Sequence, residues 1–171
     1  MALSSDKQLP SQENLLLDYM RRLEKHKEDR KVVHLHLSLL RPMNRQEQHL
    51  RTAVGSFENV VKVMDGQVFT VKNADIFVIY KNTAHPQVET AVQQARYLFD
   101  NDPLIMEEDN SDQKFASWYD AEQDFDNVLQ IVQGMAHAEQ KRQTEVRNRM
   151  DARSALKAKQ EQGEPLTPRV L

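Results

Sequence analysis

His34 and His36 are the residues of this 171-residue chain whose type and spacing could most directly do chemistry. They lie two positions apart in a segment where apolar and polar residues alternate, so on a strand both side chains would share one face. Imidazoles at this spacing can hold a metal ion, and His49 or His85 could supply a third ligand. The alternative is a polar strand face that the first helix partly covers. Because no carboxylate is tied to the pair in the sequence, we favour this alternative and predict no metal site.

A run of acidic residues between positions 100 and 126 is the second candidate for cation binding. Only 1 basic side chain accompanies 10 acidic ones in this segment. The acidic residues considered are Asp109, Asp112, Asp120, Glu122 and Asp124. An EF-hand loop needs a fixed pattern of ligands with glycine at its sixth position, and that pattern does not occur here. Residues 104–114 are therefore predicted to be a solvated acidic loop, and the acidic surface could still dock a basic partner.

Several common chemistries are excluded by residues that the chain lacks. It contains no Cys, which excludes disulfides, thiolate metal sites and cysteine nucleophiles. Its 4 Gly are far apart, whereas phosphate-binding loops need several glycines within a few residues. No serine has a Gly-x-Ser-x-Gly context, so we assign no nucleophile and predict no cofactor.

The distribution of charge and hydropathy predicts which partners are absent. The net charge is -3, and the mildly basic segments 1–51 and 127–171 flank the acidic segment without forming a continuous basic face. We therefore expect no nucleic-acid partner. No signal peptide is recognisable, and no apolar run approaches the roughly 18 residues of a membrane span. The sequence predicts a cytoplasmic protein without membrane association.

The elements that position these residues begin with an amphipathic helix within residues 1–30, capped by Ser11. Its apolar stripe consists of Leu16, Tyr19, Met20 and Leu23. Alternation predicts a strand over residues 31–40. A helical period then extends from a capping box, formed by Asn44 and Glu47, to residue 64.

The second half of the chain continues with two strands, over residues 67–71 and 75–80, joined as a β-hairpin. A helix from Pro86, a short aromatic strand around Trp118 and Tyr119, and an amphipathic helix over residues 125–135 follow. Trp118 and Tyr119 should lie on opposite faces, one of them in the core. Residues 136–171 have good helix propensity but no core face, and we expect a polar helical linker or tail. The central order β-α-β-β-α-β predicts the α+β class. We expect a ferredoxin-like antiparallel sheet with helices on one face, plus a flanking N-terminal helix and a polar C-terminal helix.

The turn of the predicted hairpin resembles the signature of a GGDEF domain. It reads Asn73-Ala74-Asp75-Ile76-Phe77. In active members the turn reads Gly-Gly-Asp/Glu-Glu-Phe and lies between the second and third strands of the same fold. The resemblance covers residues 31–135 by the order and spacing of elements, and Asp75 and Phe77 match the motif. It implies a nucleotidyl-cyclase type of domain.

The departures from the family's pattern imply that cyclase activity has been lost. The family's tandem glycines let GTP phosphates lie against the turn, whereas a Cβ at Asn73 and Ala74 would obstruct that approach. The metal-binding Asp-x-Asp-x-Phe at the end of the first strand is replaced by the His-Leu-Ser-Leu-Leu of residues 36–40. The inhibitory Arg-x-x-Asp upstream of the turn is also absent. Asn44 matches a nucleotide-contacting asparagine of the family, but asparagine is equally a good helix cap. Of the carboxylates that hold the metal ions, only Asp75 remains.

Three hypotheses about function follow. In the first, residues 31–135 are a degenerate GGDEF-like domain, a non-catalytic regulatory and dimerisation domain in cyclic di-GMP signalling. The resemblance implies coupling to an EAL phosphodiesterase domain or another signalling protein outside this chain, and we expect the chain to be part of a longer protein. Self-association would use the flanking helices, with the Leu16–Leu23 stripe as candidate contacts, although packing of the first helix on its own sheet is an equal alternative. The second hypothesis is a ferredoxin-like protein-interaction adaptor with no nucleotide connection. The third is an enzyme with a site around Asp75 and the histidines.

Overall fold

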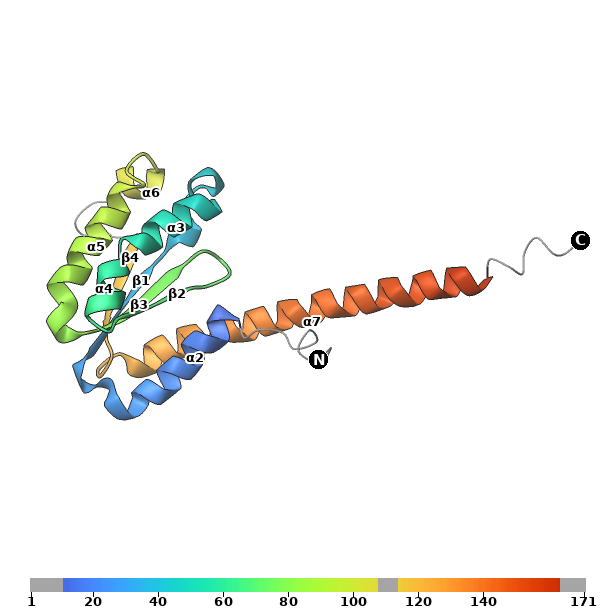
Figure 1. Ribbon diagram of the computed structural model, residues 1–171, viewed down its shortest axis with the longest axis horizontal. Coiled ribbons are helices and arrows are strands. Elements are labelled where there is room, and N and C mark those ends of the chain that lie inside the picture. Colours follow the sequence, from blue (N-terminus) through green and yellow to red (C-terminus); the bar gives the residue numbers. More distant parts are fainter. Residues whose placement is uncertain (1–10, 108–113, 164–171) are drawn as a thin grey trace, which may run out of the picture.

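A four-stranded antiparallel sheet lies at the centre of the fold, with helices on both of its faces (Figure 1). The computed structural model describes residues 11–107 and 114–163. The strands are β1 (Arg30–Leu35), β2 (Gln67–Thr70), β3 (Ile76–Lys81) and β4 (Ala116–Asp120). Their order across the sheet is β2-β3-β1-β4, and every neighbouring pair is antiparallel. The α+β class and the predicted hairpin between the second and third strands are confirmed.

β1 is shorter than predicted, and the difference shapes the candidate site. The strand ends at Leu35, and Leu37–Leu39 form a 3-10 turn, so the prediction of a strand over residues 31–40 is wrong in its second half. Leu37 and Leu40 are both buried in the same core cluster. Residues three apart would face opposite sides of a strand, whereas a 3-10 turn brings them to one side. Burial of this leucine pair therefore favours the turn.

One face of the sheet is covered by α3 (Glu47–Gly55), α4 (Glu58–Val63), α5 (His85–Tyr97) and the short α6 (Pro103–Met106). The predicted continuous helix over residues 44–64 is wrong, because the chain breaks between Gly55 and Glu58. Gly55 and Ser56 are weak helix formers, and the break leaves Phe57 fully buried. The cap is also different: Gln46 caps α3 with His49, and Asn44 is bonded elsewhere.

The other face is covered by α2 (Gln12–Leu23) and by the first part of α7 (Phe125–Gly163), which pack against each other. Ser11 caps α2 as predicted, accepting a hydrogen bond of 3.1 Å from the N–H of Asn14. The two helices that the sequence indicated as flanking elements thus complete the core on this side. As expected, the helices between the strands lie on one face of the sheet, and the two flanking helices cover the opposite face, so the sheet is sandwiched between two helical layers.

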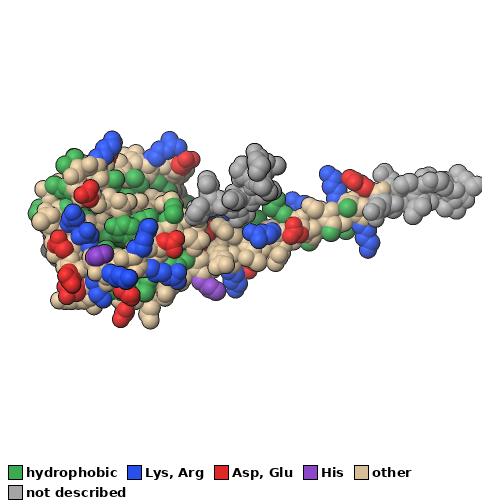
Figure 2. Space-filling view, turned by 60° about the horizontal axis from the view of Figure 1, so that its bottom comes forward, with side chains coloured by type: hydrophobic (Ala, Val, Ile, Leu, Met, Phe, Trp, Pro, Cys, Tyr) green, Lys and Arg blue, Asp and Glu red, His purple; other side chains and the backbone are tan. Residues whose placement is uncertain are grey.

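The predicted polar tail is helical and continuous with the preceding amphipathic helix, forming α7, a single helix of 39 residues. Beyond Glu139 it extends away from the sheet, and its larger apolar residues Val146, Met150 and Leu156 are exposed (Figure 1). In Figure 2, acidic and basic side chains are interspersed over the visible face of the sheet domain. Within residues 11–107 and 114–163, no helix has both the length and the hydropathy that a membrane span requires.

The acidic segment is more ordered than the predicted loop. Pro103–Met106 form the helical turn α6, capped by Asp102. Asp120 accepts hydrogen bonds from the N–H groups of Glu122 and Gln123, and Asp124 accepts one from the N–H of Asp120. These carboxylates therefore build the turn that precedes α7. Asp109, Asp112 and the end of the chain at residues 164–171 lie outside the described residues.

Candidate functional site

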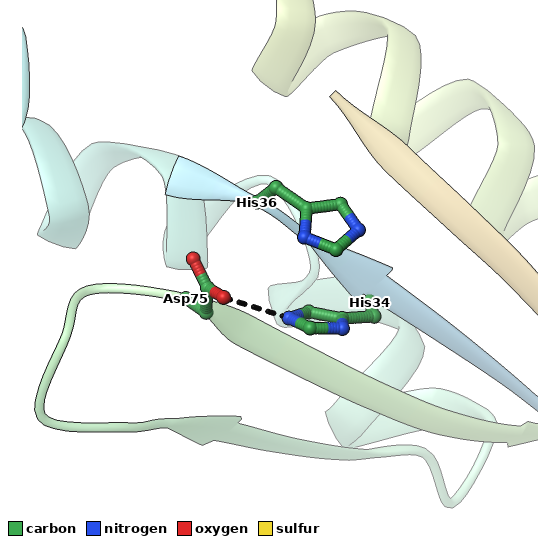
Figure 3. A group of neighbouring side chains, drawn as sticks. All are labelled: His34, His36 and Asp75. Carbon is green, nitrogen blue, oxygen red and sulfur yellow. Dashed lines mark hydrogen bonds and ion pairs between the residues drawn. The ribbon is translucent and has the colours of Figure 1, made fainter. Parts of the chain in front are cut away.

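Three side chains that the sequence analysis singled out converge where β1 ends (Figure 3). His34 belongs to β1, His36 directly follows it, and Asp75 directly precedes β3. The antiparallel register pairs His34 with Phe77 and Leu35 with Ile76, which brings the next residues, His36 and Asp75, side by side. Sheet pairing therefore unites segments that lie 41 positions apart in the case of His34 and Asp75.

Asp75 is the anchor of this group and is only 3% exposed. Its Oδ2 lies 2.8 Å from Nε2 of His34, and its Oδ1 accepts a hydrogen bond of 2.8 Å from the N–H of Ser38. The 3-10 turn after β1 presents this N–H, so the early end of the strand supplies the contact. Burial by itself raises the pKa of Asp75, but the hydrogen bonds from His34 and Ser38 outweigh burial and leave the pKa below its ordinary value. Asp75 is therefore ionised at neutral pH.

The two imidazoles lie against each other at a tilt of 37°, and the His34 ring is stacked on that of Phe77. The ring centroids of His34 and His36 are 4.0 Å apart, and the His34 ring lies 4.0 Å from that of Phe77. Nε2 of His36 is 2.7 Å from the hydroxyl oxygen of Ser117 on β4. Burial lowers the pKa of His36, the neighbouring His34 lowers it further, and Asp75 offsets only part of this. His36 is therefore neutral at neutral pH, with its second nitrogen directed toward Asp75 and His34 (Figure 3).

The metal-ligating atoms of His34, His36 and Asp75 all lie within 4.8 Å of one another. In the described ranges this is the one group of three such residues. The third residue of this group is neither His49 nor His85, the two candidates that the sequence offered. His49 instead accepts a hydrogen bond from the N–H of Gln46. His85 bonds the hydroxyl of Tyr80 at 2.9 Å. The missing carboxylate is Asp75, which the antiparallel pairing of β1 with β3 could have indicated.

The Asn73–Phe77 turn is held closely by its own contacts. Ala74 has a φ of 85°, in the left-handed region that favours glycine. The side-chain oxygen of Asn73 accepts a hydrogen bond of 3.0 Å from the N–H of Asp75. Ile76 and Phe77 are fully buried, in the cores of opposite faces of the sheet. The turn therefore presents backbone and an already bonded carboxylate.

The turn also contacts the helical layer formed by α2 and α7. Glu13 of α2 accepts a hydrogen bond of 2.9 Å from the N–H of Lys72. A cavity of about 240 Å³ lies between this contact and α7, lined among others by Asn73, Glu139 and Arg142. Arg142 forms a bidentate ion pair with the buried carboxylate of Glu139. The hairpin turn is thus bonded to α2 and faces α7 across this cavity.

The proposed interaction stripe on the first helix lies inside the fold. Leu16 and Met20 are fully buried, and Leu23 is 6% exposed, all in the core between α2, α7 and the sheet. Tyr19 is partly buried, with its ring 5.7 Å from that of Phe69. The structure therefore shows this helix packed on its own sheet, which was the alternative to self-association through the stripe.

A second group of polar and aromatic side chains was missed by sequence reasoning. Tyr80, His85 and Glu89 form a chain of contacts beside an open pocket of about 340 Å³. Trp118 also lines this pocket and is 38% exposed, whereas Tyr119 packs in the opposite core. The expected split of these two aromatics between opposite faces is confirmed. The sequence signal that could have indicated this group is His85 at the start of the helix that follows the strand with Tyr80.

Comparisons with known proteins add no relationship to this geometry, because no family model, curated protein or solved structure matches the chain.

Proposed function

We propose that this chain is a non-catalytic regulatory domain of cyclic di-GMP signalling, with a degenerate GGDEF-like domain of ferredoxin-like fold. Two features of the fold support this. The strand order β2-β3-β1-β4, with α3 and α4 before β2 and α5 before β4, is that of a split βαβ arrangement. The hairpin that carries Asp75 lies between its second and third strands. The proposal further assigns the chain to the cytoplasm and couples it to an EAL phosphodiesterase domain.

The proposal rests on the backbone conformation and the side-chain contacts of the Asn73–Phe77 turn. Ala74 adopts a glycine-like φ at a position where the resembling family has glycine, yet its Cβ remains and is 7% exposed. The Asp75 carboxylate, which would hold Mg²⁺ in an active cyclase, is engaged by His34 and Ser38 instead. Ile76 occupies the position of an acidic residue and is fully buried. A glycine-like backbone conformation at Ala74 thus combines with side chains that oppose nucleotide binding.

Regulation without catalysis needs a route from this domain to a partner, and α7 offers one. The helix begins in the core beneath the sheet, passes the hairpin turn at Glu139 and continues beyond the domain. A change at the turn would reach α7 through α2, because Glu13 of α2 accepts the hydrogen bond from Lys72 and α2 packs against α7. Self-association of this protein would use the exposed part of α7, since the stripe of α2 is internal.

Calorimetric titration of the full chain with GTP and Mg²⁺ tests the loss of cyclase function. We expect no binding, and none in the double variant Asn73→Gly/Ala74→Gly, because Asp75 stays bonded to His34 and Ser38. Micromolar binding that Asp75→Ala abolishes would contradict the proposal.

The signalling role is tested by cyclic di-GMP levels in cells that carry variants of the gene. Leu16→Asp, which places a charge in the core, should change the level as in-frame deletion of residues 11–163 does. Leu15→Asp, at a neighbouring exposed position, should leave it unchanged. Unaltered levels in the deletion strain would reject the signalling role.

A protein-interaction adaptor with no nucleotide connection is the second candidate. It is favoured by Val146 and Met150, which are exposed on one face of α7 beyond the sheet. The deletion strain separates the candidates, because an adaptor of this kind would leave cyclic di-GMP unchanged.

A further inference from the structure

We propose that His34, His36 and Asp75 form a binding site for one divalent transition-metal ion, with Zn²⁺ as the reference ion. The three ligand atoms come from β1, the residue after β1 and the residue before β3, and lie within 4.8 Å of one another. Two imidazoles and one carboxylate are donors typical of zinc sites that keep a fourth position open for water. This inference is independent of the role in cyclic di-GMP signalling.

The donor set favours a transition metal over Mg²⁺ or Ca²⁺. Magnesium and calcium prefer carboxylate, carbonyl and water oxygens, whereas imidazole nitrogens suit Zn²⁺, Co²⁺, Ni²⁺ and Cu²⁺. Only one oxygen of Asp75 is directed toward the histidines, because the other is held by the N–H of Ser38. The carboxylate would therefore bind through Oδ2 alone.

Outer contacts hold two of the ligands in the orientation that a metal ion needs. The hydroxyl of Ser117 lies 2.7 Å from Nε2 of His36, which leaves the other nitrogen of this ring free to ligate. Such partners on the far side of a ligand fix its tautomer and commonly strengthen metal binding.

Binding requires a small local change that the site can make. Nε2 of His34 and Oδ2 of Asp75 are 2.8 Å apart and share a hydrogen bond. Ligand atoms about 2.0–2.1 Å from a tetrahedral zinc lie about 3.3 Å from each other. The ion would replace this hydrogen bond, with the two atoms separating by about half an ångström. His34 is stacked on Phe77, and the carboxylate of Asp75 would make most of this movement, whereas His36 keeps its contact with Ser117.

Titration calorimetry of the metal-free, untagged full chain with Zn²⁺ tests the proposal, with Mg²⁺ as the comparison ion. The principal variant is His36→Ala, because His36 is the ligand outside the core. The matched control is His137→Ala, which removes an exposed histidine of α7. Co²⁺ gives a second readout, since its visible absorption reports coordination directly. Circular dichroism verifies that each variant is folded, and Asp75→Asn repeats the test if His36→Ala is not.

We expect one Zn²⁺ per chain, an increase in Tm with Zn²⁺ but not with Mg²⁺, and a Co²⁺ spectrum typical of low coordination number. His36→Ala should lose more than about 100-fold in Zn²⁺ affinity, since even outer contacts of metal sites contribute 10–100-fold. His137→Ala should bind as the unmodified chain does. Absence of Zn²⁺ binding to the unmodified chain, or equal affinity of the folded His36→Ala variant, would overturn the proposal.

Discussion

The side-chain amide of Asn44 donates a hydrogen bond of 2.8 Å to the carboxylate of Asp102, which lies 58 positions further along the chain. The same carboxylate accepts hydrogen bonds from the N–H groups of Arg41 and Leu104, each at 2.9 Å. Asp102 is 1% exposed, so three donors are satisfied by one buried side chain. This carboxylate thereby joins the loop after β1 to the start of α6.

Replacement of Asp102 by alanine should therefore destabilise the fold. We expect a loss of about 2–3 kcal/mol in the free energy of unfolding, because the donors of Arg41, Asn44 and Leu104 lose their shared charged acceptor. Urea denaturation measures the loss. Asp100→Ala, at an exposed position two residues earlier, is the matched control and should change little. Equal stabilities of the two variants would show that the Asp102 contacts contribute nothing.

Acid should weaken the same junction. Burial by itself raises the pKa of Asp102, but the hydrogen bonds from Asn44, Arg41 and Leu104 outweigh it and hold the pKa below its ordinary value. A group with a lower pKa in the folded state stabilises the fold above the unfolded-state pKa, about 4, and loses this contribution as the pH falls through the folded-state pKa. The free energy of unfolding should therefore decrease on acidification below about pH 5. The free energy of unfolding of Asp102→Asn should decrease less steeply with falling pH than that of the unmodified chain. The slope that remains includes the contribution of Asp75. Parallel pH dependences of the two proteins would contradict the assignment to Asp102.

The buried stripe of α2 gives a test that separates internal packing from dimerisation. Leu16→Ala should cost about 2–5 kcal/mol, the range for removing a fully buried leucine side chain. Leu15→Ala, at a position that is 38% exposed, should cost much less. Thermal unfolding at several protein concentrations measures both. A Tm of the unmodified chain that rises with concentration and becomes independent of it in Leu16→Ala would instead assign Leu16 to a subunit contact.

Two glycines should respond to alanine with opposite signs. A Cβ at Gly66 would lie 2.7 Å from Cγ1 of Val60, so Gly66→Ala should destabilise by about 1–3 kcal/mol through overpacking. A Cβ at Gly134 meets nothing within 4 Å, and this residue lies inside α7. Gly134→Ala should therefore stabilise by about 0.5–1 kcal/mol, the propensity difference between the two residues in a helix. The two Tm values measure the contrast, and shifts of the same sign would contradict it.

The sequence predicted those elements whose periodicity belongs to one kind of structure only. β3 was recognised because Ile76–Tyr80 is apolar at every position, and α5 because its buried positions recur at spacings of three and four. The end of β1 and the break between α3 and α4 were missed because local patterning is similar with and without them. Burial of Leu37 and Leu40 against other elements determines the turn after β1, and burial of Phe57 determines the break between the two helices.

The sequence grouped only the two histidines of the candidate site, for a related reason. The spacing of His34 and His36 was a local signal, and it favoured a shared strand face. Asp75 joins them through the register of two strands, which a single sequence does not specify without a known fold. Ser117 on β4 and the N–H of Ser38 complete the surroundings by the same sheet pairing and by an unexpected turn.

The length of α7 has a geometric consequence for anything attached beyond the sheet domain. At 1.5 Å per residue, its 39 residues span about 58 Å, and each residue advances the helix by about 100° around its axis. A partner that binds the distal turns is therefore held in a fixed rotational position about the axis of α7, relative to the sheet. One residue inserted after Met150 would turn the distal segment by about a quarter-turn, whereas seven would restore its bearing almost completely and add about 10 Å of reach. If the effect of an insertion follows this rotation, α7 acts as a rigid helix. A flexible linker would show no such dependence on the number of inserted residues.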